Sequence, residues 1–186
     1  MRRTTIFLIV FSVLIFNCIS CKKNNEPKET VTMVKPDDYY HYILDEDNKI
    51  ISKMLDLNKA FDMADARRID HMLKMLQKQT ESSVYEIAKL KPFENDSSLK
   101  TSAKKLFEFY KSLSEEEYVD LSDILKKKEL SDDDIAKCRK IQKSIIERES
   151  PLDINFTNAQ NEFAAKYGFQ LKSNSKLQSE IKNKDK

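Results

Sequence analysis

Apolar residues recur every three or four positions along much of the chain, which is the spacing of one face of an α-helix. The most regular stripe lies between residues 65 and 91 and consists of Ile69, Met72, Leu76, Thr80, Val84, Ile87 and Leu90. Another stripe lies between residues 37 and 61, is interrupted by Asp47, and consists of Tyr40, Ile43, Ile50, Met54, Leu57 and Phe61. The two stripes predict two helices joined by a short connection.

The later of these helices should end at Pro92, because proline has no amide hydrogen to donate. A turn is expected at residues 93–96. A third helix should begin near Ser97, with an apolar stripe of Leu99, Ala103, Leu106, Tyr110, Leu113, Leu121, Ile124 and Leu125. Ser114 and Glu117 fit a capping box that would divide this helix, but we expect it to be continuous.

A fourth helix is expected to start after Ser131, where Asp132, Asp133 and Asp134 suit the positive end of a helix. Pro151 lies inside this helix and is expected to kink or break it. The stripe consists of Ile135, Cys138, Ile141, Ile145, Leu152, Phe156, Ala159, Phe163 and Tyr167.

The glycine content supports an all-α fold. The chain has one glycine in 186 residues, against an average of about 7%, and hairpin turns and bulges depend on glycine. That residue, Gly168, is placed as a left-handed cap of the fourth helix, with Phe169 folding back toward Phe163 or Ala164.

Four amphipathic helices with short connections favour an antiparallel up-down-up-down four-helix bundle over residues 37–169. The connections near residues 62–65 and 129–131 would then lie together at one end. Residues 21–36 are polar and predict a flexible tether. Residues 170–186 are also polar and predict a disordered tail.

The first twenty residues have the pattern of an export signal. Arg2 and Arg3 precede an apolar run over residues 6–16, which is typical of a secretory leader. An uncleaved membrane anchor is the alternative, but the apolar segment over residues 6–20 is shorter than the roughly 20 residues that a spanning helix needs. Residues 1–20 are therefore expected to be a cleaved signal peptide.

A cysteine follows this leader at the place where lipoprotein signals carry their lipidation site. Bacterial lipoprotein signals resemble one another in placing a small residue directly before the acylated cysteine. Cys21 follows Ser20 and is the expected site, while Cys18 follows Asn17 and is the alternative. Acyl chains on the new N-terminus would hold the protein at a lipid bilayer. The expected location is the bacterial cell envelope, at the outer membrane, facing the periplasm or the cell surface.

Charge and cysteine content narrow the classes of partner. Removing residues 1–20 takes away Arg2 and Arg3 but no acid, so the formal net charge falls from +2 to 0. A neutral chain lacks the basic surface that nucleic acids require. Beside a lipidated Cys21 only Cys138 remains, so we expect no intramolecular disulfide and interpret Cys138 as a core thiol.

Candidate chemistry is sparse. His41 and His71 are not part of the Glu-x-x-His pairs that bind metals in helical bundles, so we expect no metal, no other cofactor, no catalytic residue and no enzymatic activity. The one cluster of functional interest is aromatic and consists of Tyr39, Tyr40, His41 and Tyr42. These rings could contact a sugar or a partner protein, or they could cover the open end of the core.

Three segments carry a family resemblance: Lys89–Asp96, Leu106–Tyr110 and Asn161–Phe169. They resemble the LIC-type bacterial surface lipoproteins, which are small helical envelope proteins. The resemblance covers residues 37–169 and implies an all-α fold at the envelope or cell surface, with no catalytic residues. The expected function is a membrane-anchored binding or interaction module for an envelope or extracellular protein or glycan. The alternative is a periplasm-facing structural lipoprotein without a dedicated ligand.

Overall fold

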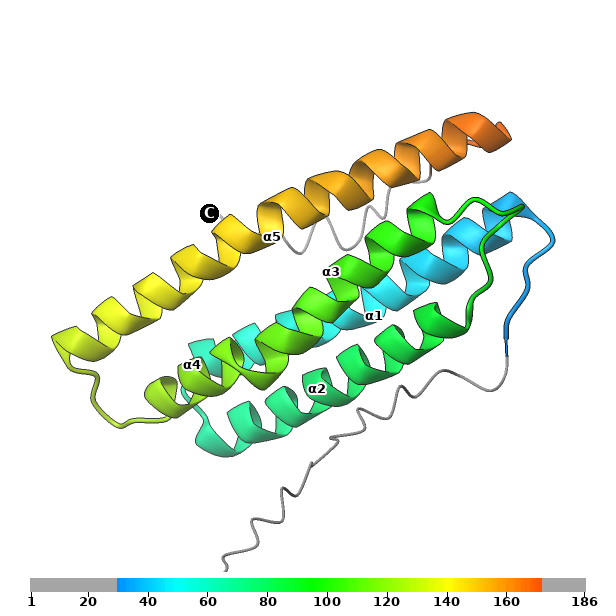
Figure 1. Ribbon diagram of the computed structural model, residues 1–186. Helices are drawn as coiled ribbons and strands as arrows, with labels where there is room; N and C mark the ends of the chain where they lie inside the picture. The colour runs from blue at the N-terminus through cyan, green and yellow to red at the C-terminus, as the bar shows by residue number, and fades with distance from the viewer. Residues whose placement is uncertain (1–29, 172–186) are drawn as a thin grey trace, which may run out of the picture.

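The computed structural model describes residues 30–171, and every element in that range is a helix (Figure 1). The all-α prediction is confirmed. None of the described helices combines the length and hydrophobicity needed to cross a membrane. The predicted signal peptide, Cys18, Cys21 and most of the predicted tail lie outside the described residues. The helices are α1 (Pro36–Asp62), α2 (Ala66–Lys89), α3 (Ser98–Glu115), α4 (Glu117–Leu125) and α5 (Asp132–Tyr167).

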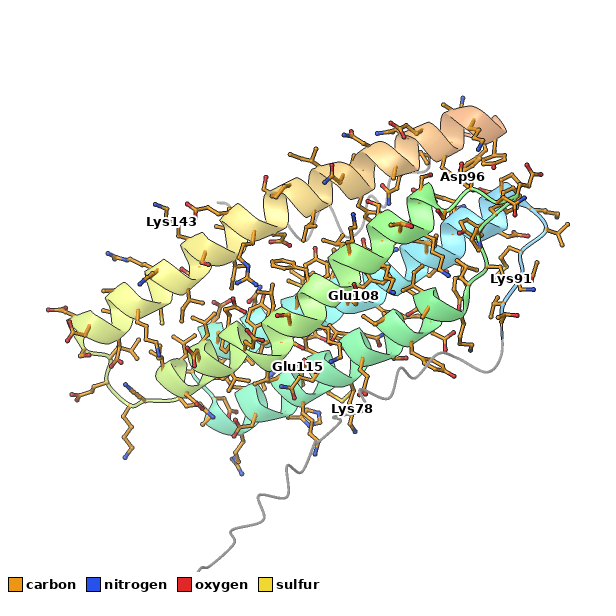
Figure 2. All side chains as sticks on the ribbon, in the orientation of Figure 1. Lys78, Lys91, Asp96, Glu108, Glu115 and Lys143 are labelled. Carbon is orange, nitrogen blue, oxygen red and sulfur yellow. The ribbon has the colours of Figure 1, made fainter. Side chains whose placement is uncertain are left out.

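Apolar packing between neighbouring helices holds the body together. α1 packs mainly on α2, α2 on α3, and α3 on α5, while α4 contacts α2, α3 and α5 (Figure 1). The core contains most of the predicted stripe residues, and the largest fully buried side chains include Tyr39, Phe107 and Phe163. Figure 2 shows Lys78 on α2 and Lys143 on α5 pointing away from the other helices. Most stripe residues therefore face inward, and these two lysines face solvent.

The prediction of a continuous third helix is wrong, because the helix breaks at Glu116 between α3 and α4. The Ser114–Glu117 capping box is not the cause, since α4 has no side-chain cap. Ser114 is fully buried and faces α2 instead. The side chain of Gln77 donates a 2.9 Å hydrogen bond to the Ser114 carbonyl, which in an unbroken helix would accept from the amide four residues on.

α5 runs through Pro151 without interruption, so the predicted break does not occur. Its start and end agree with the sequence pattern. Ser131 and Asp134 form a capping box, and Gly168 adopts a left-handed φ of 71°. The predicted fold-back of Phe169 is confirmed, because its ring lies 6.0 Å from that of Phe163, centroid to centroid.

Both flanks of the helical body are more tightly packed than their polar composition predicts. The amide of Val31 donates to the Lys89 carbonyl at 2.9 Å, and the amide of Lys91 donates to the Val31 carbonyl at 2.8 Å. Val31, Met33 and Leu171 are partly buried against the core. The predicted tether over residues 21–36 is therefore corrected, since its end from Val31 onward belongs to the folded body.

Candidate functional site

A cleft of about 540 Å³ opens between the C-terminal end of α1, the short helix α4 and the first half of α5. This volume lies within the range of small-molecule sites, which is roughly 300–1,000 Å³. Most of the lining residues are apolar or aromatic, and the amide and carboxylate side chains come from α1 and α5. The lining residues are Asn58, Phe61, Asp62, Tyr118, Leu121, Leu125, Cys138, Gln142, Ile145 and Ile146.

The break at Glu116 positions the middle wall of this cleft. Because α4 starts anew after the break, its apolar side places Tyr118 and Leu121 against the core with exposed fractions of 8% and 3%. Two ion pairs then fix α4 to α5: Glu117 pairs with Arg148, and Asp120 pairs with Lys137 at 3.5 Å. Two of the three helices that bound the cleft are therefore tied to each other.

The rim of the cleft leaves apolar surface open to solvent. Ile146 on α5 is 64% exposed, although the neighbouring Ile145 is 7% exposed. Binding is favoured when a ligand removes such apolar surface from water. The rim can therefore contribute to binding an apolar group.

Cys138 lines the cleft and is partly exposed. This corrects the interpretation of Cys138 as a core thiol. Partial burial raises the pKa of the thiol, and the nearby carboxylate of Asp134 acts in the same direction, while Lys137 and Lys127 act against both. A raised pKa keeps the thiol protonated and makes it a weak nucleophile, so Cys138 contributes apolar surface to the cleft.

Three carboxylates gather where α5 continues beyond the cleft. Asp47 on α1 interacts electrostatically with Glu149 and Asp153 on α5. The Asp47 side chain is partly exposed as a whole, but its Oδ1 atom is buried and has no hydrogen-bond partner in the described part of the chain. Among residues 30–171, none of the three carboxylates forms an ion pair with a lysine or arginine. We call Asp47, Glu149 and Asp153 the carboxylate cluster.

Burial and mutual repulsion set the electrostatics of the carboxylate cluster. Burial, followed by the charges of Asp153 and Glu149, raises the pKa of Asp47 to about 7. Burial and Asp153 also raise the pKa of Glu149, although the hydroxyl of Tyr110 donates to Glu149 Oε1 at 2.9 Å and lowers it. Because a like charge disfavours ionisation, each carboxylate of the cluster makes the others harder to ionise.

The predicted aromatic cluster is divided between the core and the surface. Tyr39 and Tyr40 are buried, with exposed fractions of 0% and 4%. Tyr39 stacks on Phe163 at 5.4 Å, and burial raises its pKa to about 12. These two rings therefore close the end of the core, which was the alternative role, and they offer no surface to a ligand.

The other two ring residues of that cluster are partly exposed. The Tyr42 hydroxyl donates to Glu86 at 2.7 Å and so ties α1 to α2. His41 lies 3.1 Å from Asp37 on the same helix. His71 is exposed on α2. In the described residues, no three His, Cys, Asp or Glu side chains converge closely enough to hold a metal ion.

Sequence reasoning did not identify the cleft. Asn58 and Gln142 stand among many polar helix residues, and nothing in their spacing marks them. Two features of the sequence did mark this region. Asp47 interrupts an apolar stripe, and Ile146 is a second isoleucine directly after the stripe residue Ile145. A break in a stripe and an apolar residue beside one both indicate surface that the core alone does not explain.

No family model, curated protein or solved structure matches this chain.

Proposed function

We propose that the protein is a lipid-anchored binding module of the bacterial envelope. In this proposal residues 1–20 are removed, Cys21 carries the acyl chains with Cys18 as the alternative, and the protein stands at the outer membrane. The helical body has the up-down-up-down order, which the contacts of α1 with α2, α2 with α3, and α3 with α5 support. The partner is an envelope or extracellular protein, a glycan, or a smaller molecule of the same compartment.

One observation carries the binding role: the cleft lies at the far end of α1 from the place where the chain joins the helical body. The chain joins beside Val31, which pairs with Leu90 at the end of α2. The cleft uses Phe61 and Asp62 at the other end of α1, about 40 Å away along a helix of 27 residues. An anchor at one end and a cleft at the other would present the cleft away from the membrane.

The resemblance to LIC-type surface lipoproteins supports the same location. It rests on segments that the structure places in turns and in the core, such as Phe93 and Phe163. Turn and core residues determine the fold but do not bind ligands, so the binding role depends on the cleft and not on the resemblance.

Metabolic labelling tests the anchor. The full chain is expressed in a Gram-negative host with an alkyne analogue of palmitate, and the label is read after gel separation. We expect label on the wild type and on Cys18→Ser, and its loss with an unprocessed leader in Cys21→Ser. An unlabelled wild type would refute the anchor. Label on Cys21→Ser together with its loss from Cys18→Ser would move the site to Cys18.

Protease treatment of intact cells tests which face the body occupies. A surface module should be degraded before lysis, and a periplasm-facing body should be degraded only afterwards. The matched control is a periplasmic protein of the host, which must remain intact in the same sample.

A further inference from the structure

The carboxylates of α5 do not line the cleft, but they follow its lining residues along the helix. Glu149 follows Ile145 by four residues, and Asp153 follows Ile146 by seven. These spacings place Glu149 on the same face of the helix as Ile145, and Asp153 on the same face as Ile146. Glu149 therefore lies about 6 Å along the helix axis from the cleft wall at Ile145.

α1 repeats this arrangement on the opposite side. Asp47 precedes the cleft residue Asn58 by eleven residues, which is about three helical turns and returns to the same face. The apolar cleft thus leads, on two helices, toward carboxylates at one end.

Aromatic rings stand where the apolar part meets the carboxylates. Tyr118 lines the cleft, and its pKa is raised by burial first and then by the charges of Glu149 and Glu117. Tyr110 on α3 holds Glu149 by a hydrogen bond. The ring of Tyr118 lines the cleft near these carboxylates, and an aromatic ring there favours an organic cation, because the ring face attracts positive charge.

The chemistry of the site selects among cations. A divalent metal needs several oxygen ligands at about 2.0–2.6 Å, and the described side chains form no such group. An ammonium group spreads its charge over a larger surface and needs no such geometry. A cation attached to an apolar body would satisfy the cleft and the carboxylates together.

We propose that this site binds a hydrophobic amine or quaternary ammonium compound, with its apolar body in the cleft and its positive charge at Asp47, Glu149 and Asp153. This inference rests on the proposed binding function and names the class of ligand. Asp153, which pairs with no lysine or arginine among residues 30–171, supplies negative charge, and Asp47 adds to it when ionised. Ile146 supplies the exposed apolar rim.

The rate at which the Cys138 thiol is chemically modified reports whether a ligand occupies the cleft. Membrane vesicles that carry the full chain are treated with N-ethylmaleimide, and modification of the peptide containing Cys138 is followed by mass spectrometry. The rate is measured with octyltrimethylammonium or octanoate below the micelle concentration, or with octanol below its solubility limit. Each rate is divided by the rate without additive. We expect octyltrimethylammonium to slow modification at a concentration at least tenfold below that needed of octanoate.

Substitution of single carboxylates localises the charge. Asp153→Asn is the main variant, because Asp153 is exposed and its loss should leave the fold intact. We expect a three- to tenfold weaker effect of octyltrimethylammonium in Asp153→Asn and in Asp47→Asn, with octanol unchanged. Glu162→Gln, an exposed acid further along α5, is the matched control and should behave like the wild type.

Protection by the cation should also increase from pH 5 to pH 8, since ionised carboxylates attract it more strongly. The groups on the neighbouring helices that interact with the carboxylate cluster are Tyr110 on α3 and Tyr118 on α4. Equal protection by octyltrimethylammonium and octanoate, or an unchanged effect in both Asn variants, would refute the cationic ligand. If octanol and octanoate protect Cys138 as well as the cation does, the binding module stands and only the ligand class fails. If no compound protects Cys138, the cleft is refuted as the binding site of the proposed function.

Discussion

The hydroxyl of Tyr110 on α3 donates a 2.9 Å hydrogen bond to Oε1 of Glu149 on α5. Tyr110 is 4% exposed, so this bond forms where water is largely excluded. It holds the Glu149 carboxylate in the α3–α5 interface, about one helical turn beyond the cleft residue Ile145. One pair of residues therefore links the packing of the helices to the charge of the candidate site.

Replacing Tyr110 by phenylalanine removes this bond and keeps the ring. We expect the free energy of unfolding to fall by about 1 kcal/mol, because Glu149 loses a donor in a partly buried place. Urea denaturation at pH 7 measures the change. Tyr85→Phe is the matched control, since Tyr85 is 44% exposed, and it should unfold with the wild type. A Tyr110→Phe variant as stable as Tyr85→Phe would contradict the role of the bond.

Asp47 should make the stability depend on pH. Burial and the carboxylates of Asp153 and Glu149 raise its pKa from 3.8 to about 7, so between these values the folded chain holds a proton that the unfolded chain releases. Stability present below pH 4 is therefore lost as the pH rises toward 7. We expect the wild type to be less stable at pH 8 than at pH 5 by on the order of 1–3 kcal/mol.

Asp47→Asn cannot titrate and should lack this contribution. Urea unfolding at pH 5, 6, 7 and 8 gives the two profiles, and the groups that both proteins share cancel in the difference between the profiles. Asp45→Asn, an exposed neighbour on α1, should follow the wild type. Parallel profiles for the wild type and Asp47→Asn would show that Asp47 ionises normally in the folded protein.

Gly168 should resist substitution for conformational reasons alone. Its φ is +71°, and a Cβ atom built on it meets nothing within 4 Å. Gly168→Ala should cost about 1 kcal/mol, since an L residue is strained in the left-handed region. Gly168→Asn should cost less, because asparagine tolerates this conformation. Thermal unfolding ranks the three proteins, and an alanine variant as stable as the asparagine variant would contradict the strain.

Ser114 should matter as a buried hydrogen-bonding residue of the α2–α3 interface. Its hydroxyl lies 3.2 Å from the Thr80 hydroxyl and donates to the Lys111 carbonyl at 2.8 Å. We expect Ser114→Ala to lower the free energy of unfolding by about 1 kcal/mol, measured with urea. Ser82→Ala, at an exposed position of α2, is the control. Equal stability of the two variants would argue against the network.

The sequence by itself determined the elements whose causes are local. Helix periodicity placed the stripes of α1 and α2, Pro92 and the single glycine placed two ends, and Ser131 with the acids after it placed the start of α5. Each of these depends on residues within a turn or two of one another, so the chain pattern contains the physical cause. Pro151 shows the limit of such local rules, because α5 continues through it within a packed body.

Only the tertiary structure decided the features that join distant residues. The side chain of Gln77 donates a hydrogen bond to the Ser114 carbonyl just before the break between α3 and α4, although 37 residues separate the two residues. The burial of Tyr39 and Tyr40 depends on contacts with Phe163 and Phe169, which lie more than 120 residues later in the sequence. The carboxylate cluster arises because the fold brings Asp47 on α1 within electrostatic range of Glu149 and Asp153 on α5. The cleft arises where α1, α4 and α5 meet. Such contacts follow from how helices pack in three dimensions, and a periodic pattern along one helix carries no information about its neighbour.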